Sequence, residues 1–314
     1  MYLMLSLPRR LISIEIIFAV IMIFACGCAK KDGVRQEFSK EGRLTGEYTY
    51  VKGVREGAFR EFDEDARKIA EGIIKGGKRH ETRYTYYLNG KVKTQIQLVD
   101  DVKDGESKVF SAGGVPALER NYKMGKVSGI EREYGFDGSL EVERTYENDQ
   151  LNGMVREYSG GVLRFEKMYV NNRLHGLTKE YAGDRTLKAE RNYKDDLLDG
   201  ISKEYDGSGN LVAQQLFASG QVDTTWDFYP DGRVMRETKM SRGQPAVIRE
   251  YYNNPALKVA LMRERFLEEG KTVQVNEYYE TGNLMYRKYF SNEVIIRTEQ
   301  FDINGNITTM QGDP

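Results

Sequence analysis

Cysteine is nearly absent from the sequence, since its two cysteines, Cys26 and Cys28, both lie near the N-terminus. The rest of the chain can therefore form neither a disulfide nor a thiolate metal site. Histidine (2 residues) and proline (6 residues) are also scarce. The net charge of -1 lacks the basic excess that is typical of nucleic-acid-binding domains, so we expect no nucleic acid among the partners.

Tyrosine and glycine are abundant instead, with 21 and 32 residues, and they recur at a fixed interval. A first aromatic residue recurs about every 24 residues, so that about eleven repeats run from Phe38 to Phe301. This period indicates an architecture in which each repeat contacts only its neighbours. The first aromatics are Phe38, Phe62, Tyr86, Phe110, Tyr134, Tyr158, Tyr181, Tyr205, Tyr229, Tyr251, Tyr278 and Phe301.

Each repeat holds two segments with the alternation of β-strands. In residues 129–134, Ile130, Arg132 and Tyr134 share one face, and a second such segment follows at residues 140–146. A glycine-containing turn (residues 135–139) joins them, and a longer polar return leads to the next repeat. The sequence predicts an all-β fold, with tandem hairpins of about 24 residues in an elongated, twisted antiparallel sheet or solenoid. We expect one apolar and one polar face.

The first 28 residues differ in composition from the rest of the chain. Arg9 and Arg10 precede an apolar run (residues 11–24) that is shorter than the roughly 20 residues of a spanning helix. Ala25-Cys26-Gly27-Cys28 resembles a lipobox, with Cys28 as the expected lipidation site and Cys26 as the second choice. An uncleaved anchor is the alternative. The predicted order is a signal peptide (1–28), a linker (29–37), the repeats (38–305, irregular at 251–278) and a tail (306–314).

The repeat resembles a known family. One repeat carries the matching residues Gly129, Tyr134, Gly138, Leu140, Glu143 and Tyr146, and the next carries Gly153, Tyr158, Gly161, Leu163, Glu166 and Tyr169. The pattern resembles the MORN repeat variant (the second MORN type), whose tandem copies define the YwqK-type, toxin–antitoxin-system antitoxin-like family. The resemblance implies hairpin repeats with a binding or scaffold role. Departures are Glu81 and Thr224 in the glycine position and Pro116 in the leucine position.

No residues are predicted to be catalytic, to bind a cofactor or to bind a metal. His80 and His175 occupy the same variable position before the glycine and lie four repeats apart. A glutamate recurs before the first aromatic. It could form an acidic row for calcium, but an Arg or Lys precedes it in most repeats, so we expect a charge-balanced ladder. The glutamates are Glu61, Glu133, Glu157, Glu180, Glu204, Glu250 and Glu277.

One repeat carries aromatic residues where the others carry charged ones. Trp226 and Phe228 align with the positions of Glu131 and Glu133, so we expect them to lie exposed beside each other. Exposed aromatics of this kind often anchor protein partners. Local repacking near residues 251–278 is the alternative.

These features predict a non-enzymatic, lipid-anchored repeat protein that is a protein–protein interaction scaffold at the bacterial cell envelope. The expected partners are another protein and, through the N-terminal lipid, a membrane, which would be the outer membrane if the cell has one. One alternative is an antitoxin or immunity-type protein that neutralises a toxin. A further alternative is an envelope glycan-binding module, in which tyrosine rows stack on sugars.

Overall fold

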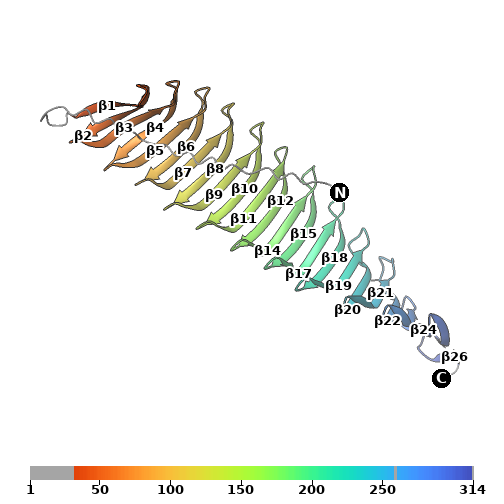
Figure 1. Cartoon of the computed structure of the whole chain (residues 1–314). Helices are drawn as coiled ribbons and strands as arrows, with labels where there is room; N and C mark the ends of the chain where they lie inside the picture. Colours follow the sequence, from red (N-terminus) through yellow and green to blue (C-terminus); the bar gives the residue numbers. More distant parts are fainter. Residues whose placement is uncertain (1–31, 258–259, 313–314) are drawn as a thin grey trace, which may run out of the picture. The chain divides into compact units, whose positions relative to one another are not determined.

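The computed structural model describes residues 32–257 and 260–312, which form 26 β-strands (Figure 1). None of these residues lies in an α-helix. The predicted all-β fold of antiparallel hairpins is therefore confirmed. The head, with Cys26 and Cys28, lies outside the described residues. The described residues divide into two compact units, with the boundary between Pro116 and Ala117.

The first compact unit contains strands β1–β7, each paired antiparallel with the next along the chain. Tight turns can join such strands directly. Phe59, Tyr48 and Ile74 pack into a small core in which Phe59 is only 2% exposed. The strands are β1 (Gly33–Phe38), β2 (Leu44–Val51), β3 (Val54–Phe62), β4 (Lys68–Lys75), β5 (Lys78–Tyr86), β6 (Val92–Val99) and β7 (Val102–Phe110).

The second compact unit continues the hairpin pattern, with successive hairpins side by side (Figure 1). Its strands are β8 (Pro116–Lys123), β9 (Lys126–Tyr134), β10 (Leu140–Glu147), β11 (Gln150–Ser159), β12 (Val162–Val170), β13 (Arg173–Leu174), β14 (Gly176–Tyr181), β15 (Leu187–Lys194), β16 (Leu197–Leu198), β17 (Gly200–Tyr205), β18 (Leu211–Ala218), β19 (Gln221–Phe228), β20 (Val234–Ser241), β21 (Gln244–Tyr251), β22 (Leu261–Glu268), β23 (Lys271–Tyr278), β24 (Leu284–Ser291), β25 (Val294–Phe301) and β26 (Ile307–Gln311).

The returns between hairpins are tight turns, and the prediction of long polar returns is wrong. β10 ends at Glu147 and β11 begins at Gln150, so only Asn148 and Asp149 lie between them. Both have positive φ, at 50° and 68°. Two-residue hairpin turns require this conformation, and Asn and Asp adopt it at little cost. The Asn-Asp pair is therefore the feature of the sequence that indicates a tight turn.

These turns also tie each repeat to the one before it. Asp149 Oδ1 accepts the backbone N–H of Val127 at 2.7 Å, and the Asp149 N–H donates to the Val127 carbonyl at 2.9 Å. Asn172 makes the same two bonds with Leu151, at 2.7 and 2.9 Å. The turn side chain thus satisfies backbone groups that the strand ladder leaves open.

The recurring glycine has a backbone reason. Gly153 has a φ of +126°, and a Cβ there would lie 3.0 Å from Cβ of Thr145 on the neighbouring strand. A side chain would meet both backbone strain and a steric clash. Glu81, which replaces this glycine in its own repeat as the sequence indicated, also has a positive φ, at 58°.

The two aromatic rows lie on opposite faces, so the prediction of one apolar and one polar face is wrong. Tyr146 pairs with Gly129, whereas Tyr134 lies five residues further along β9. Because side chains alternate along a strand, residues five apart point to opposite faces. Each face therefore carries both aromatic and charged side chains. A bulge near Leu140 adds one residue to β10. The spacing of the two aromatics in the sequence therefore does not show that they lie on opposite faces.

The strands extend past the predicted repeat range of 38–305. β1 lies largely within the predicted linker, and β26 lies within the predicted tail. The irregular interval 251–278 keeps its strand pairing, since β22 pairs with both β21 and β23. Its extra residues lie in the connection from β21 to β22, which Tyr252 N–H closes on the carbonyl of Ala260 at 2.9 Å.

Candidate functional site

A single row of paired side chains crosses the second compact unit, and we call it the charged row. The members alternate between acid and base over most of its length, each paired with the next across neighbouring strands. In strand order they are Glu119, Arg132, Glu143, Arg156, Glu166, Lys179, Glu190, Lys203, Gln214, Trp226, Glu237, Arg249, Glu264, Asn276, Arg287 and Glu299.

Ion pairs bridge the charged row from strand to strand. Glu143 accepts Arg132 Nε at 2.9 Å and Arg156 Nη1 at 3.0 Å. Arg156 also donates through Nε to Glu166 at 3.1 Å. Further along, Arg249 bridges Glu237 and Glu264 at 3.2 and 2.8 Å. Cross-strand pairs of opposite charge contribute modestly each, and here they compensate one another along the row.

The first aromatics of the repeats complete this arrangement. The Tyr181 hydroxyl donates to Glu166 at 2.9 Å, and the Tyr205 hydroxyl donates to Glu190 at 2.9 Å, in each case 15 residues upstream. Burial, followed by the Glu166 hydrogen bond, raises the pKa of Tyr181 to about 12. The motif glutamate of one hairpin thus accepts a hydrogen bond from the motif tyrosine of the next hairpin, and this contact links the two.

The Tyr181 contact predicts a loss of stability at alkaline pH. Its folded-state pKa of about 12 exceeds the ordinary value of about 10, so the unfolded chain releases the proton first. The stabilisation is complete below pH 10 and is lost as the pH rises to about 12. Urea unfolding at several pH values in this window should show a smaller decline for Tyr181→Phe than for the parent chain. Parallel declines in the two proteins would contradict the assignment.

The glutamates before the first aromatic lie on the face opposite the charged row, because the Arg or Lys before most of them belongs to that row. Glu180 accepts Arg191 Nη1 at 2.9 Å and Lys188 Nζ at 2.7 Å, and these bonds, Lys188 first, hold its pKa below the ordinary value. Glu277 pairs with Lys288 at 3.1 Å. Six of the seven glutamates pair with a basic side chain, but not with the Arg or Lys that precedes them, and Glu204 has no ion pair among the described residues. In residues 32–257 and 260–312, no cluster of three or more His, Cys, Asp or Glu side chains could hold a metal ion.

The charged row is interrupted at two consecutive positions, Gln214 and Trp226, and again at Asn276. Lys203 pairs with Gln214 across the strands, and Gln214 pairs with Trp226. Gln214 stands where neighbouring hairpins carry the motif glutamate, and Trp226 stands where they carry Arg or Lys. Beyond Trp226 the ion pairs resume at Glu237. Sequence reasoning missed Lys203 and Gln214, although Gln214 departs visibly from the Leu-x-x-Glu motif.

The predicted alignment of Trp226 and Phe228 is wrong by one residue. The turn bond from Tyr229 N–H to Arg233 O (2.8 Å) is the equivalent of the bond from Gly135 to Ser139 (2.9 Å). Phe228, not Tyr229, is therefore the first aromatic of its repeat.

The same offset moves the neighbouring positions. Trp226 takes the position of Arg132 rather than that of Glu131, and Asp223 rather than Thr224 takes the glycine position. Trp226 and Phe228 are two residues apart on β19, so they lie on the same face as expected, but both are partly buried rather than exposed. Their role as a partner surface stays a prediction.

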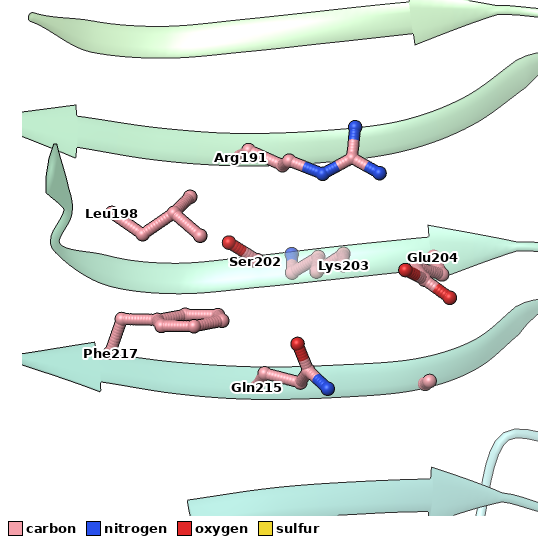
Figure 2. Close-up of a pocket in the computed structure, with 8 residues that line it drawn as sticks. Arg191, Leu198, Ser202, Lys203, Glu204, Gln215 and Phe217 are labelled. Carbon is pink, nitrogen blue, oxygen red and sulfur yellow. The ribbon is translucent and has the colours of Figure 1, made fainter. Parts of the chain in front are cut away.

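A small hollow lies on the face of β17 that is opposite to the charged row (Figure 2). Leu198, Phe217 and Gln215 surround Ser202, whose hydroxyl has no hydrogen-bond partner among the described residues. The hollow has a volume of about 50 Å³, which is room for one or two water molecules. The hollow is too small to hold a substrate.

The two histidines occupy equivalent positions just after the return turns, His80 on β5 and His175 between β13 and β14. His80 Nε2 lies 3.4 Å from Asp100, and His175 Nδ1 lies 3.6 Å from Asp195. His80 belongs to the first compact unit and His175 to the second. Each therefore has a local carboxylate neighbour, and neither lies in the charged row.

Residues 198–218 match the family described as the MORN repeat variant. The chain therefore contains a MORN repeat variant. The match spans β17 and β18, with Lys203 and Gln214 inside it. No curated protein matches the chain.

Several solved structures match the chain at low similarity. They include crystal structures of TcdB2-TccC3 (11% identity, TM-score 0.20), TcdB2-TccC3-Cdc42 (12%, 0.19) and TcdB2-TccC3 without its hypervariable C-terminal region (13%, 0.17). The matches cover 89% of this chain but only 18%, 19% and 21% of those chains. The chain thus spans about a fifth of their length. Similarity at this level carries no conclusion about the fold or function of the chain.

In the part of the chain that the structure describes, no helix is long and apolar enough to span a membrane.

Proposed function

We propose that this chain is a non-enzymatic, lipid-anchored MORN-variant repeat protein that binds another protein at the bacterial cell envelope. The observation that carries the proposal is the charged row with its interruption at Gln214 and Trp226, next to Lys203. From Arg132 to Glu166, and again from Glu237 to Glu264, the row compensates its own charges through strand-to-strand ion pairs. Side chains that are already satisfied have little to offer a partner, whereas an interruption leaves groups available for one.

The repeat architecture supports a binding role. Repeat proteins present broad surfaces built from residues at equivalent positions, and they tolerate a change of side chain within a single repeat. The partly buried Trp226 is the only tryptophan of the chain. Tryptophan is enriched among the residues that dominate binding energy at protein interfaces.

The proposed anchor predicts a sharp result for Cys28→Ser. This variant should lose radiolabel from palmitate and should move from the membrane fraction to the soluble fraction, because the proposed lipid is attached at Cys28. Cell fractionation with labelled palmitate measures both effects.

Cys26→Ser is the matched control, since it changes the other cysteine of the same segment. It should keep both the label and the membrane association. Loss of label in Cys26→Ser alone would move the lipid to Cys26. Unlabelled, soluble protein in the parent chain would contradict the anchor and would favour a cytoplasmic partner.

The resemblance to the YwqK-type family keeps an antitoxin or immunity function as the second candidate, in which the partner is a toxin. Glycan binding is the third, since tyrosine faces can stack on sugars. A crosslinked partner that inhibits growth when expressed alone would favour the antitoxin function. Retention on envelope polysaccharide without any crosslinked protein would favour glycan binding.

A further inference from the structure

Lys203 is the exception among the basic residues of the charged row. Arg132, Arg156, Lys179, Arg249 and Arg287 each have a row carboxylate within 4.0 Å, the longest of these contacts being 3.9 Å from Lys179 to Glu190. Within the described residues, Lys203 has no such contact. Its neighbour Glu190 is already engaged by Lys179 and by the Tyr205 hydroxyl.

Two substitutions side by side create this gap. Gln214 removes the acid that would pair with Lys203, and Trp226 removes the base that would pair with that acid. If only one member of an acid–base pair were lost, the charge of the other member would have no partner. Because both are lost together, the sheet keeps its pairing while the face gains an aromatic side chain two strands away from Lys203, with Gln214 between them.

The surroundings of the gap are apolar. Ile201 is 41% exposed and lies two residues before Lys203 on β17, so it points to the same face. Leu216 pairs with Ile201 on one side of the row, and Phe228 follows Trp226 on the other side. A carboxylate near Lys203 could therefore bind while apolar groups next to it cover Trp226.

We propose that Ile201, Lys203, Gln214, Leu216, Trp226 and Phe228 form a docking surface for an acidic peptide segment of a protein partner, in which a carboxylate supplies the charge that Gln214 lacks. The inference rests on the proposed function, since it names the chemistry of the partner. Charge complementarity at Lys203 selects an acidic segment over a neutral or basic one. The aromatic anchor provides most of the affinity, and the carboxylate provides selectivity.

A labelled peptide tests this proposal with the full chain. The probe is a short fluorescein-labelled, glutamate-rich peptide with one central phenylalanine, and its counterparts carry glutamine or lysine in place of glutamate. Binding is followed by fluorescence anisotropy and by the emission of Trp226, the single tryptophan. The acidic peptide should shift the emission and bind at least about 10-fold more tightly than the lysine peptide, with weaker binding at high salt.

Gln214→Glu is the decisive variant, because it restores the motif acid and supplies the missing carboxylate from within the chain. It should weaken binding of the acidic peptide by about 10-fold or more. Gln95→Glu is the matched control, since Gln95 holds the equivalent position between Tyr84 and Lys108 in the first compact unit. Its binding should equal that of the parent chain.

Equal binding of the acidic and lysine peptides, unchanged binding by Gln214→Glu, or no binding of any peptide would overturn the proposal. These results are separable from a failure of the proposed function. If the chain is lipid-anchored and crosslinks a protein through other residues, the function stands and only this docking surface is rejected.

Discussion

Phe59→Ala should destabilise the first compact unit by about 4 kcal/mol, which is the range for removing a buried phenylalanine from a core. Phe59 is 2% exposed and packs against Tyr48, with ring centroids 6.1 Å apart. It also lies over Gly72 on the paired strand, where a Cβ would lie only 2.9 Å from the ring. Neighbouring side chains cannot readily fill the space, because glycine occupies the opposite position.

Urea unfolding together with hydrogen exchange of β2, β3 and β4 measures the effect, and exchange is needed because repeat arrays can unfold in parts. Phe136→Ala is the matched control, since Phe136 is a fully exposed phenylalanine in a turn. It should change stability by less than about 0.5 kcal/mol. Similar effects from the two variants would contradict the assignment of this core.

Glu131→Ala should destabilise the hairpin of β9 and β10 by about 3 kcal/mol, because removing one partner of a buried ion pair leaves the other charge uncompensated. Glu131 is 2% exposed and accepts hydrogen bonds from Arg120 and from Arg144 Nη1, the latter at 3.0 Å. The arginines are partly exposed, which places the expected loss at the lower end of the range for buried pairs.

Hydrogen exchange should show faster exchange in β8, β9 and β10 with little change in β22 to β24, since repeats contact only their neighbours. Glu147→Ala removes an exposed glutamate from the same hairpin and serves as the control. A triple replacement of Arg120, Glu131 and Arg144 by Met, Leu and Met should restore most of the stability. Persistent destabilisation in the triple variant would show that Glu131 acts through something other than charge pairing.

The repeat period and the hairpin were readable from sequence because they depend on local chemistry. Glycine followed by alternating residues, a glycine-containing turn and regular aromatics all act within one repeat. The hairpin turn at Gly135 shows this, since Asp137 and Ser139 close it through their own hydrogen bonds. These signals require no knowledge of the neighbouring strand.

The faces could not be read from sequence because they depend on register. A bulge at Leu140 adds one residue, and a single added residue transfers every later side chain to the other face. The same sensitivity produced the offset at Trp226, where Tyr229 follows Phe228 and either aromatic fits the periodic position. The turn hydrogen bond at Tyr229 distinguishes the two, and only the structure provides it.

The gap at Lys203 was invisible for a related reason. Lys203, Gln214 and Trp226 follow one another at intervals of 11 and 12 residues, so nothing in the sequence itself connects them. Strand pairing places them next to one another in the charged row. The candidate site is thus a property of the pairing between hairpins rather than of any one motif.

Photocrosslinking in intact cells tests most directly whether the chain binds a protein through the interrupted row. Benzoylphenylalanine is placed at Gln214 in the full chain, and at Gln95 as the matched position of the other compact unit. The account predicts a discrete crosslinked protein from position 214, none from position 95, and loss of the product when Trp226→Arg is added. No crosslinked protein at position 214, or the same products from both positions, would contradict it.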